Sequence, residues 1–317
     1  MRLLFWGTPD FAAPALRALL GEGFEVVGVV TQPDKPIGRS RSTLAPPPVK
    51  SIALEEGLPV LQPERPRGAG FLDQLRALEP DVSVVVAYGH ILPKDVIDLP
   101  EQGTLNIHAS LLPRWRGAAP IQAAIRAGDA ETGVTIMRMV PALDAGPILL
   151  QVPTPILDDE TFGELRLRLS ELGALAIVEA LALISVEKAT ETIQDDTRAT
   201  LAPKVEREHA RVSWAGDAID VSRTVRAYDP QPGAFTTLRG DEVKLFGARV
   251  ENESPRAMSG AHLLPGVVAD IDRTAMLVGC GSGAVRISHV QPAGKKRLTA
   301  AEWSRGRGVQ LGDRLGA

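Results

Sequence analysis

The first half of the chain alternates short apolar runs with stretches of helical periodicity. Residues 2–6, 26–31 and 82–87 are almost continuously apolar, whereas residues 12–20 and 70–78 carry apolar side chains at helical spacing. Strands that alternate with helices are covered on both faces of a parallel sheet, which explains their apolar composition. The pattern therefore predicts an α/β fold with a Rossmann-like, doubly wound parallel sheet.

The pattern changes in the second half of the chain. Residues 161–184 predict a long amphipathic helix, which we interpret as a packing helix. A polar, threonine-rich stretch follows, and beyond it come short β-patterned runs separated by Gly, Asp or Pro. These runs are 235–238, 243–248, 266–271, 275–279 and 285–290. Several short strands with such turns are typical of a small barrel.

Length and charge divide the chain in the same way. At 317 residues the chain exceeds the usual size of one hydrophobic core. We predict one domain at 1–185, a linker at 186–205 and a second domain at 206–317. Residues 1–202 carry 18 basic and 26 acidic side chains, whereas residues 203–317 carry 17 and 13, so the basic excess lies in the smaller domain. An excess of this size is weak evidence for nucleic-acid binding by itself.

Composition excludes several classes of protein. No apolar run approaches the ~20 residues that span a bilayer, and the first residues enter a strand pattern without a signal-peptide cleavage site. The single cysteine, Cys280, excludes an intrachain disulfide, and the five histidines lack metal-ligand spacing. The glycine fingerprint of dinucleotide-binding oxidoreductases is absent after the first strand run. We expect a cytoplasmic protein with no membrane partner and no metal.

An amide, an imidazole and a carboxylate form the candidate site. Asn106 and His108 are two residues apart in a β-patterned run, so their side chains point to the same face of a strand. Asp144 stands at a turn after the apolar run 134–140. The amide and the imidazole can stabilise an oxyanion, and the carboxylate can orient the imidazole and assist proton transfer. Because no nucleophilic side chain belongs to the set, it favours direct acyl transfer to an external amine.

The neighbourhood of this set decides between a structural and a catalytic interpretation. A short Asn-x-His pair by itself is structural in most proteins. Here it is followed by a Pro/Arg/Gly-rich loop, 113–120, which we expect to be exposed and which runs into a helical pattern. Loops of this kind commonly carry function, so the catalytic interpretation is favoured.

Longer motifs extend along the chain. They are Gly-Thr-Pro-Asp-Phe-Ala at 7–12, Thr-Gln-Pro-Asp at 31–34, Pro-Pro-Val-Lys at 47–50, Val-Val-Val-Ala-Tyr-Gly at 84–89, the block 106–120, Ala-Glu-Thr-Gly-Val-Thr-Ile-Met at 130–137 and Gln-Pro-Ala-Gly-Lys-Lys at 291–296. On these motifs the chain resembles the methionyl-tRNA formyltransferase family over nearly its full length. It departs from the family at Gln231, where tryptophan is frequent, and at Leu201, where tyrosine is frequent.

The resemblance implies a reaction and its participants. It implies transfer of a formyl group from the co-substrate 10-formyltetrahydrofolate to the α-amine of methionyl-initiator tRNA, with Asn106, His108 and Asp144 as the catalytic residues. It implies an OB-like barrel that helps to bind tRNA, and a monomer without an obligate protein partner. The implied folate-binding residues are Val86, Ala87, Tyr88, Gly89, Ile91, Leu92, Ser110, Leu111, Leu112 and Pro113. The predicted tRNA-binding residues are Arg39, Arg41, Lys204, Arg207, Lys295, Lys296 and Arg297.

Two alternatives remain open. A sibling enzyme that uses formyltetrahydrofolate would share the Asn/His/Asp set; it could be a hydrolase that releases formate, or a formyltransferase for a sugar amine or glycinamide ribonucleotide. Such an enzyme should not need the basic cluster 295–297 on a separate domain, where phosphate contact is its natural use. A catalytically silent tRNA-binding protein would keep the fold without turnover, and the intact Asn/His/Asp set argues against it.

Overall fold

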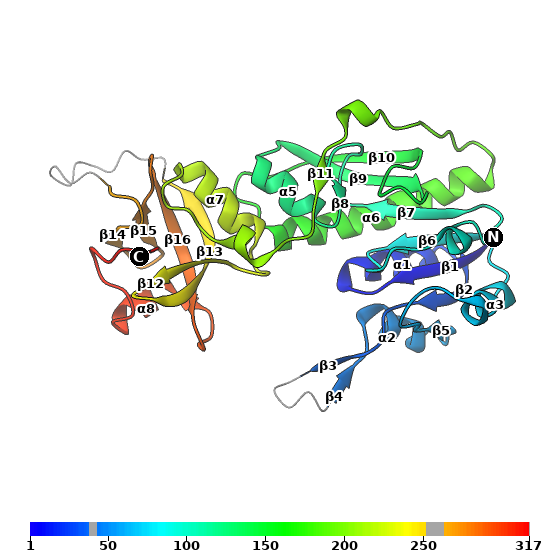
Figure 1. Ribbon diagram of the computed structural model, residues 1–317, viewed down its shortest axis with the longest axis horizontal. Coiled ribbons are helices and arrows are strands. Elements are labelled where there is room, and N and C mark those ends of the chain that lie inside the picture. The colour runs from blue at the N-terminus through cyan, green and yellow to red at the C-terminus, as the bar shows by residue number, and fades with distance from the viewer. Residues whose placement is uncertain (38–42, 252–262, 317) are drawn as a thin grey trace. The chain divides into compact units, whose positions relative to one another are not determined.

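The computed structural model describes residues 1–37, 43–251 and 263–316 of the chain (Figure 1). Contacts between residues divide the chain into two compact units. The first unit comprises Met1–Pro120, Glu131–Pro155 and Arg166–Ala202, and the second comprises Ile121–Ala130, Ile156–Leu165 and Pro203–Ala317. No helix in the described part of the chain is long and apolar enough to cross a membrane.

A seven-stranded sheet with the order β10-β9-β7-β6-β1-β2-β5 forms the centre of the first unit. Its strands are β1 (Arg2–Gly7), β2 (Glu25–Val30), β5 (Val60–Leu61), β6 (Val82–Val86), β7 (Thr104–His108), β9 (Glu131–Arg138) and β10 (Ile148–Pro155). The strands from β5 to β7 in this order are parallel, whereas β9 is antiparallel to β7 and β10 is antiparallel to β9. The predicted α/β fold with a mostly parallel sheet is confirmed.

The strand order reverses at β1, which has β2 on one side and β6 on the other. Ligands of such sheets bind beyond the carboxyl ends of the strands near this reversal. The helices of this unit are α1 (Ala13–Gly21), α2 (Pro48–Glu55), α3 (Ala69–Ala77), α4 (Lys94–Ile97) and, for most of its length, α6 (Phe162–Ser185). Short paired strands are β3 (Lys35–Ile37) with β4 (Thr43–Ala45), and β8 (Arg116–Gly117) with β11 (Leu201–Ala202).

The helix α6 packs against the sheet, as its amphipathic pattern predicts. A Cβ atom at Gly173 would lie 2.8 Å from the Cγ2 atom of Ile107 on β7, so the missing side chain lets the helix approach the strand closely. Leu169, Ile177 and Leu181 on the same helix are fully buried. The close packing of apolar side chains explains why the predicted range 161–184 matches the observed helix.

An antiparallel sheet with the order β12-β13-β16-β15-β14 forms the second unit, and β17 pairs with β16. Its strands are β12 (Ala234–Leu238), β13 (Asp241–Val250), β14 (Val268–Ile271), β15 (Met276–Gly279), β16 (Ala284–Pro292) and β17 (Leu298–Thr299). The helices are α5 (Pro120–Ala127), α7 (Ala218–Ala227) and α8 (Ala300–Arg305). All five predicted short strands occur. Closure of the sheet into an OB-like barrel stays a prediction.

Cys280 is part of the buried core of the second unit, where it lies among apolar side chains such as Val278 and Val285. Its side chain is 2% exposed, and burial, helped by the charge of Asp217, raises the pKa of the thiol to about 11. The ionised thiolate is the reactive form of cysteine. Reagents therefore have little access to the Cys280 sulfur, and only a small fraction of the thiol is in the reactive thiolate form.

We expect the thiol of the folded protein to resist alkylation by a maleimide at pH 8. At this pH, only about one thiol in a thousand is ionised when the pKa lies three units higher, and the reagent cannot reach the buried sulfur. Labelling should become fast once concentrated urea unfolds the protein. The measurement is mass spectrometry of the labelled chain over time with and without urea, and equally fast labelling of the folded protein would contradict the prediction.

Candidate active site

The candidate site lies at the carboxyl ends of two adjacent parallel strands. β6 ends at Val86 and β7 ends at His108, and the pair Val85 and Asn106 fixes their register. Asn106 and His108 are two residues apart on β7, so both side chains point to the same face. Among the described residues, the Asn106 carboxamide has no hydrogen-bond partner, and its side chain is half-buried. This amide is available to a ligand.

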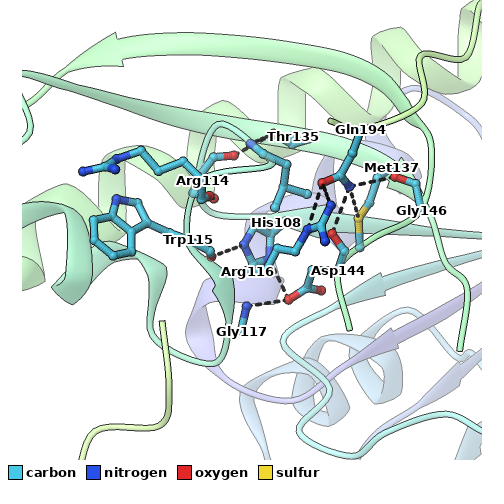
Figure 2. Close-up of polar contacts among 12 residues, drawn as sticks. His108, Arg114, Trp115, Arg116, Gly117, Thr135, Met137, Asp144, Gly146 and Gln194 are labelled. Atoms are coloured by element: carbon cyan, nitrogen blue, oxygen red, sulfur yellow. Dashed lines mark hydrogen bonds and ion pairs between the residues drawn. The ribbon is translucent and has the colours of Figure 1, made fainter. Parts of the chain in front are cut away.

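The imidazole of His108 lies between a carbonyl group and a carboxylate (Figure 2). Its Nε2 atom is 2.9 Å from the carbonyl oxygen of Trp115, and its Nδ1 atom is 3.7 Å from Oδ2 of Asp144. A carbonyl oxygen only accepts hydrogen bonds, so Nε2 carries a proton. Nδ1 is therefore the nitrogen that can gain or lose a proton, and it faces the carboxylate.

The carboxylate of Asp144 is fixed by a backbone donor. The N–H of Gly117 donates to its Oδ2 atom at 2.8 Å. The backbone of Asp144 has φ +47°, a left-handed conformation that non-glycine residues rarely adopt. Next to it, a Cβ atom at Gly146 would lie 1.8 Å from the carbonyl oxygen of Arg138, so only glycine fits there. The turn that presents the carboxylate is therefore tight: it needs a left-handed backbone at residue 144 and leaves no room for a side chain at residue 146.

The loop that follows β7 is held by side chains from the antiparallel edge of the sheet. The Thr135 hydroxyl donates to the Ser110 carbonyl oxygen at 2.6 Å and accepts from the Leu112 N–H at 3.1 Å. Gln151 donates to the Leu112 carbonyl oxygen at 2.9 Å. The Ser110 hydroxyl donates to the Arg114 carbonyl oxygen at 2.6 Å. These bonds fix the backbone of 110–114 close to His108.

The expectation that the loop 113–120 is exposed is wrong at its end, where Ala119 and Pro120 are buried, and at Arg116. This side chain is buried, with 8% exposure, because its guanidinium donates to Gln194 and pairs with Asp196 at 2.7 Å. A buried charge is stable only when it is paired and hydrogen-bonded. Arg114 is exposed as expected, and its guanidinium lies 4.3 Å from the ring centre of Trp115. Trp115 therefore lies between an exposed arginine, Arg114, and a buried one, Arg116.

The predicted folate residues at the end of β6 lie in a turn that has positive φ at Ala87 (47°) and Gly89 (94°). The Tyr88 ring is buried edge-on against Trp6, with 5.2 Å between ring centres, and burial raises the pKa of its hydroxyl to about 12. Its carbonyl oxygen accepts from the Thr8 hydroxyl at 2.9 Å. Ile91, by contrast, is 85% exposed and Leu92 is buried. In the second predicted group, Ser110 and Leu112 are buried and Leu111 and Pro113 are half-buried.

The predicted tRNA-binding residues are only partly grouped. Arg39 and Arg41 lie outside the described residues. Arg207 pairs with Glu242, whose carbonyl oxygen accepts from Ala293, so Arg207 and the turn that contains Lys295 and Lys296 meet at one end of β13. Arg297 stacks on Phe246, with 4.2 Å to the ring centre, and its guanidinium pairs with Asp229 at 3.3 Å. Lys204, Lys295 and Lys296 are exposed.

Four supporting residues escaped the sequence analysis, namely Thr135, Gln151, Arg116 as a buried group, and Gln194. Thr135 and Arg116 lie in family motifs, but nothing in the spacing of these motifs indicates the buried contacts. Gln194 belongs to a polar stretch that predicts a linker. Within the described residues, no group of three or more His, Cys, Asp or Glu side chains is placed to hold a metal ion.

Two protein-family models match the chain: formyl transferase over residues 1–181, and formyl transferase, C-terminal domain, over residues 204–308. A protein named methionyl-tRNA formyltransferase from Chromobacterium violaceum is 49% identical over 317 residues, covering 100% of both chains. A protein of the same name from Magnetococcus marinus is 48% identical over 315 residues, covering 99% of this chain and 98% of its own.

Solved structures share the fold. HypX from Aquifex aeolicus in complex with tetrahydrofolic acid has a TM-score of 0.67 at 24% identity, covering 95% of this chain and 46% of HypX, so this chain spans about half the length of HypX. Methionyl-tRNA formyltransferase from Clostridium thermocellum has a TM-score of 0.57 at 14% identity, covering 80% of this chain and 95% of that chain. These low identities show the fold alone. The full-length relatives at nearly half identity and the two matched models confirm the resemblance: the chain belongs to the methionyl-tRNA formyltransferase family.

Proposed function

We propose that this protein transfers the formyl group of 10-formyltetrahydrofolate to the α-amine of methionyl-initiator tRNA, in the cytoplasm, for translation initiation. Full-length relatives named methionyl-tRNA formyltransferase support the substrate and the acceptor. The single observation that carries the proposal is that Asn106 and His108 share one face of β7, while Asp144, from the turn between β9 and β10, lies beside His108. This set can assist the transfer of an acyl group and contains no side chain that must attack it.

The residues at the end of β6 suit a flat co-substrate that is partly apolar. Ile91 exposes an apolar side chain beside the tight turn at Ala87 and Gly89, both of which are exposed. Leu111 and Pro113 add half-buried apolar surface after β7. We propose that these residues hold 10-formyltetrahydrofolate, which supplies an activated formyl group. Tyr88 supports the turn from inside, because its ring is part of the core.

The geometry of His108 supports the following roles in the reaction. The neutral amine attacks the formyl carbon directly and forms a C–N bond in a tetrahedral intermediate, and the bond to the folate nitrogen breaks when this intermediate collapses. Asn106 donates to the formyl oxygen as negative charge develops on it. One proton leaves the amine and one proton reaches the departing folate nitrogen. His108 carries this proton on Nδ1, because its Nε2 atom is hydrogen-bonded to the Trp115 carbonyl oxygen. Asp144, 3.7 Å away, stabilises the charged imidazole.

We propose that residues 1–185 form the catalytic domain, that 186–205 link it to the next domain, and that 206–317 form an OB-like barrel that binds tRNA. The basic excess of residues 203–317 and the exposed Lys295 and Lys296 support this division. Phosphate groups attract such clusters without reading a base sequence. We propose that the protein acts as a monomer.

The test is transfer of radiolabelled formyl from 10-formyltetrahydrofolate to methionyl-initiator tRNA. Uncharged tRNA and a reaction without tRNA serve as controls, and released formate is measured in each. Label on the aminoacylated tRNA alone is the expected result. Formate released without labelled tRNA would favour the hydrolase, and no folate turnover would favour a silent binding protein.

Replacing Lys296 with alanine should weaken tRNA binding in a salt-dependent manner. Each lost phosphate contact lowers the slope of log affinity against log salt by about 1, and we expect about 3- to 10-fold weaker binding at low salt. The rate of formyl transfer at saturating tRNA should stay within about twofold. Lys94→Ala, an exposed lysine of the first unit, is the matched control. Equal salt slopes for both variants, measured by filter binding, would argue against this surface.

A further inference from the structure

Gln194 lies behind the Asp144 turn and is 8% exposed. Its Nε2 atom donates to the carbonyl oxygens of Asp144 at 2.9 Å and of Gly146 at 2.7 Å (Figure 2). Its Oε1 atom accepts from Nε and Nη2 of Arg116, at 3.1 and 2.8 Å. Every polar atom of this side chain is therefore engaged, although it comes from the stretch that predicts a linker.

Arg116 determines which way the Gln194 amide points. A guanidinium only donates hydrogen bonds, so the amide oxygen must face Arg116 and the amide nitrogen must face the two carbonyl groups. Arg116 is itself fixed, because Nη2 also contacts Asp196 at 2.7 Å and its backbone N–H donates to the Thr200 carbonyl oxygen at 2.8 Å. Only one orientation of the Gln194 amide satisfies these hydrogen bonds. Asp196 and Thr200 hold Arg116 in place and so maintain this orientation.

Residues 115–117 all contact the pair formed by His108 and Asp144, directly or through Gln194. The Trp115 carbonyl oxygen accepts from His108, and the Gly117 N–H donates to the Asp144 carboxylate. The side chain of Arg116, between them, reaches the Asp144 backbone through Gln194. A Cβ atom at Gly117 would lie 2.5 Å from the Ala202 carbonyl oxygen, so β8 is pressed against β11. Residues 115–117 thus hold both His108 and Asp144, and Gln194 of the predicted linker also holds the Asp144 backbone.

We propose that Gln194 is a positioning residue for formyl transfer, holding the left-handed Asp144 turn so that the carboxylate faces His108 Nδ1. A left-handed conformation in a non-glycine residue persists only where its surroundings impose it. The two hydrogen bonds from Gln194 to the carbonyl groups at either end of the turn supply that constraint. The reaction named here rests on the proposed function, whereas the effect on the His108 environment does not.

The kinetic test uses Gln194→Met, which keeps the length of the side chain and removes its hydrogen bonds. We expect kcat of formyl transfer to fall about 10- to 100-fold, as when the supporting groups of a catalytic site are removed. KM for both substrates should change less than about threefold, because Gln194 is buried behind the turn and only 8% exposed. Gln74→Met, on the exposed side of α3, is the matched control. An unchanged kcat in a folded Gln194→Met protein would overturn the proposal.

A double-mutant cycle separates positioning from general support of the fold. If Gln194 acts through Asp144, Gln194→Met should add less than about twofold to the loss in Asp144→Asn. Fully additive losses would overturn the proposal. If Gln194→Met fails to fold, Gln194→Glu replaces it: the carboxylate still pairs with Arg116 but repels the carbonyl oxygens of Asp144 and Gly146. The same loss of kcat is expected for this variant, and full activity would equally overturn the proposal.

A readout without turnover tests the position of the carboxylate directly. The ring ¹⁵N resonances of His108 are assigned by comparison with His108→Ala, and then followed in the variants. Gln194→Met should shift the Nδ1 resonance in the same direction as Asp144→Asn, while Gln74→Met leaves it unchanged. An unshifted Nδ1 resonance in Gln194→Met would overturn the proposal, whatever acceptor the enzyme uses. Failure of formyl transfer in the unaltered protein would instead contradict the proposed function.

Discussion

Replacing His108 with alanine should lower the rate of formyl transfer by about 10²- to 10⁴-fold, the range that a positioned acid–base group contributes. The imidazole is buried, its Nε2 atom is held by the Trp115 carbonyl oxygen, and its Nδ1 atom is left to exchange a proton beside Asp144. Alanine removes this proton carrier while Asn106 remains to stabilise the formyl oxygen. The measurement is single-turnover transfer to methionyl-initiator tRNA at saturating co-substrate.

The controls separate lost chemistry from lost binding. The affinity of His108→Ala for tRNA, measured by filter binding, should equal that of the unaltered protein, because the proposed contacts Lys295 and Lys296 lie in the second unit. His209→Ala removes an exposed histidine of the second unit and should keep full turnover. Full activity in His108→Ala would show that the mechanism proposed above is wrong.

Replacing Asp144 with asparagine should cost about 10²- to 10³-fold in kcat, because the side chain keeps its shape and loses its charge. The Gly117 N–H can still donate to the remaining oxygen, so the turn should keep its conformation. What disappears is the negative charge 3.7 Å from His108 Nδ1, which stabilises the imidazole when it is protonated. KM for either substrate should change little, since the carboxylate acts through the imidazole.

The matched control for this variant is Asp95→Asn, which removes the same charge from an exposed position at the start of α4. Thermal unfolding of both variants checks that the folds are equally stable. A drop in kcat of the same size in both would indicate a general charge effect. A change confined to KM in Asp144→Asn would assign the carboxylate to substrate binding instead of catalysis.

The main strands, the helix α6 and the shared face of Asn106 and His108 were predictable from sequence because each depends on local spacing. A buried strand is apolar over its length and a packing helix is apolar at a fixed period, so β1, β6 and α6 could be located without knowing their partners. Asn106 and His108 are two residues apart on one strand, and alternation alone places them on one face. The short helices α7, of 10 residues, and α8, of 6 residues, were not predicted.

By itself, the sequence located the main buried strands, the long helix α6, the family motifs and the three side chains that we propose carry the chemistry. Only the tertiary structure decided that Arg116 is buried and that Gln194, 78 positions along the chain, holds it behind Asp144. The pattern of apolar residues along a segment shows which face of a helix or strand is buried, because that pattern involves only residues close together in sequence. A hydrogen bond between two distant polar side chains leaves no such periodic signal, because the chain must first fold to bring them together.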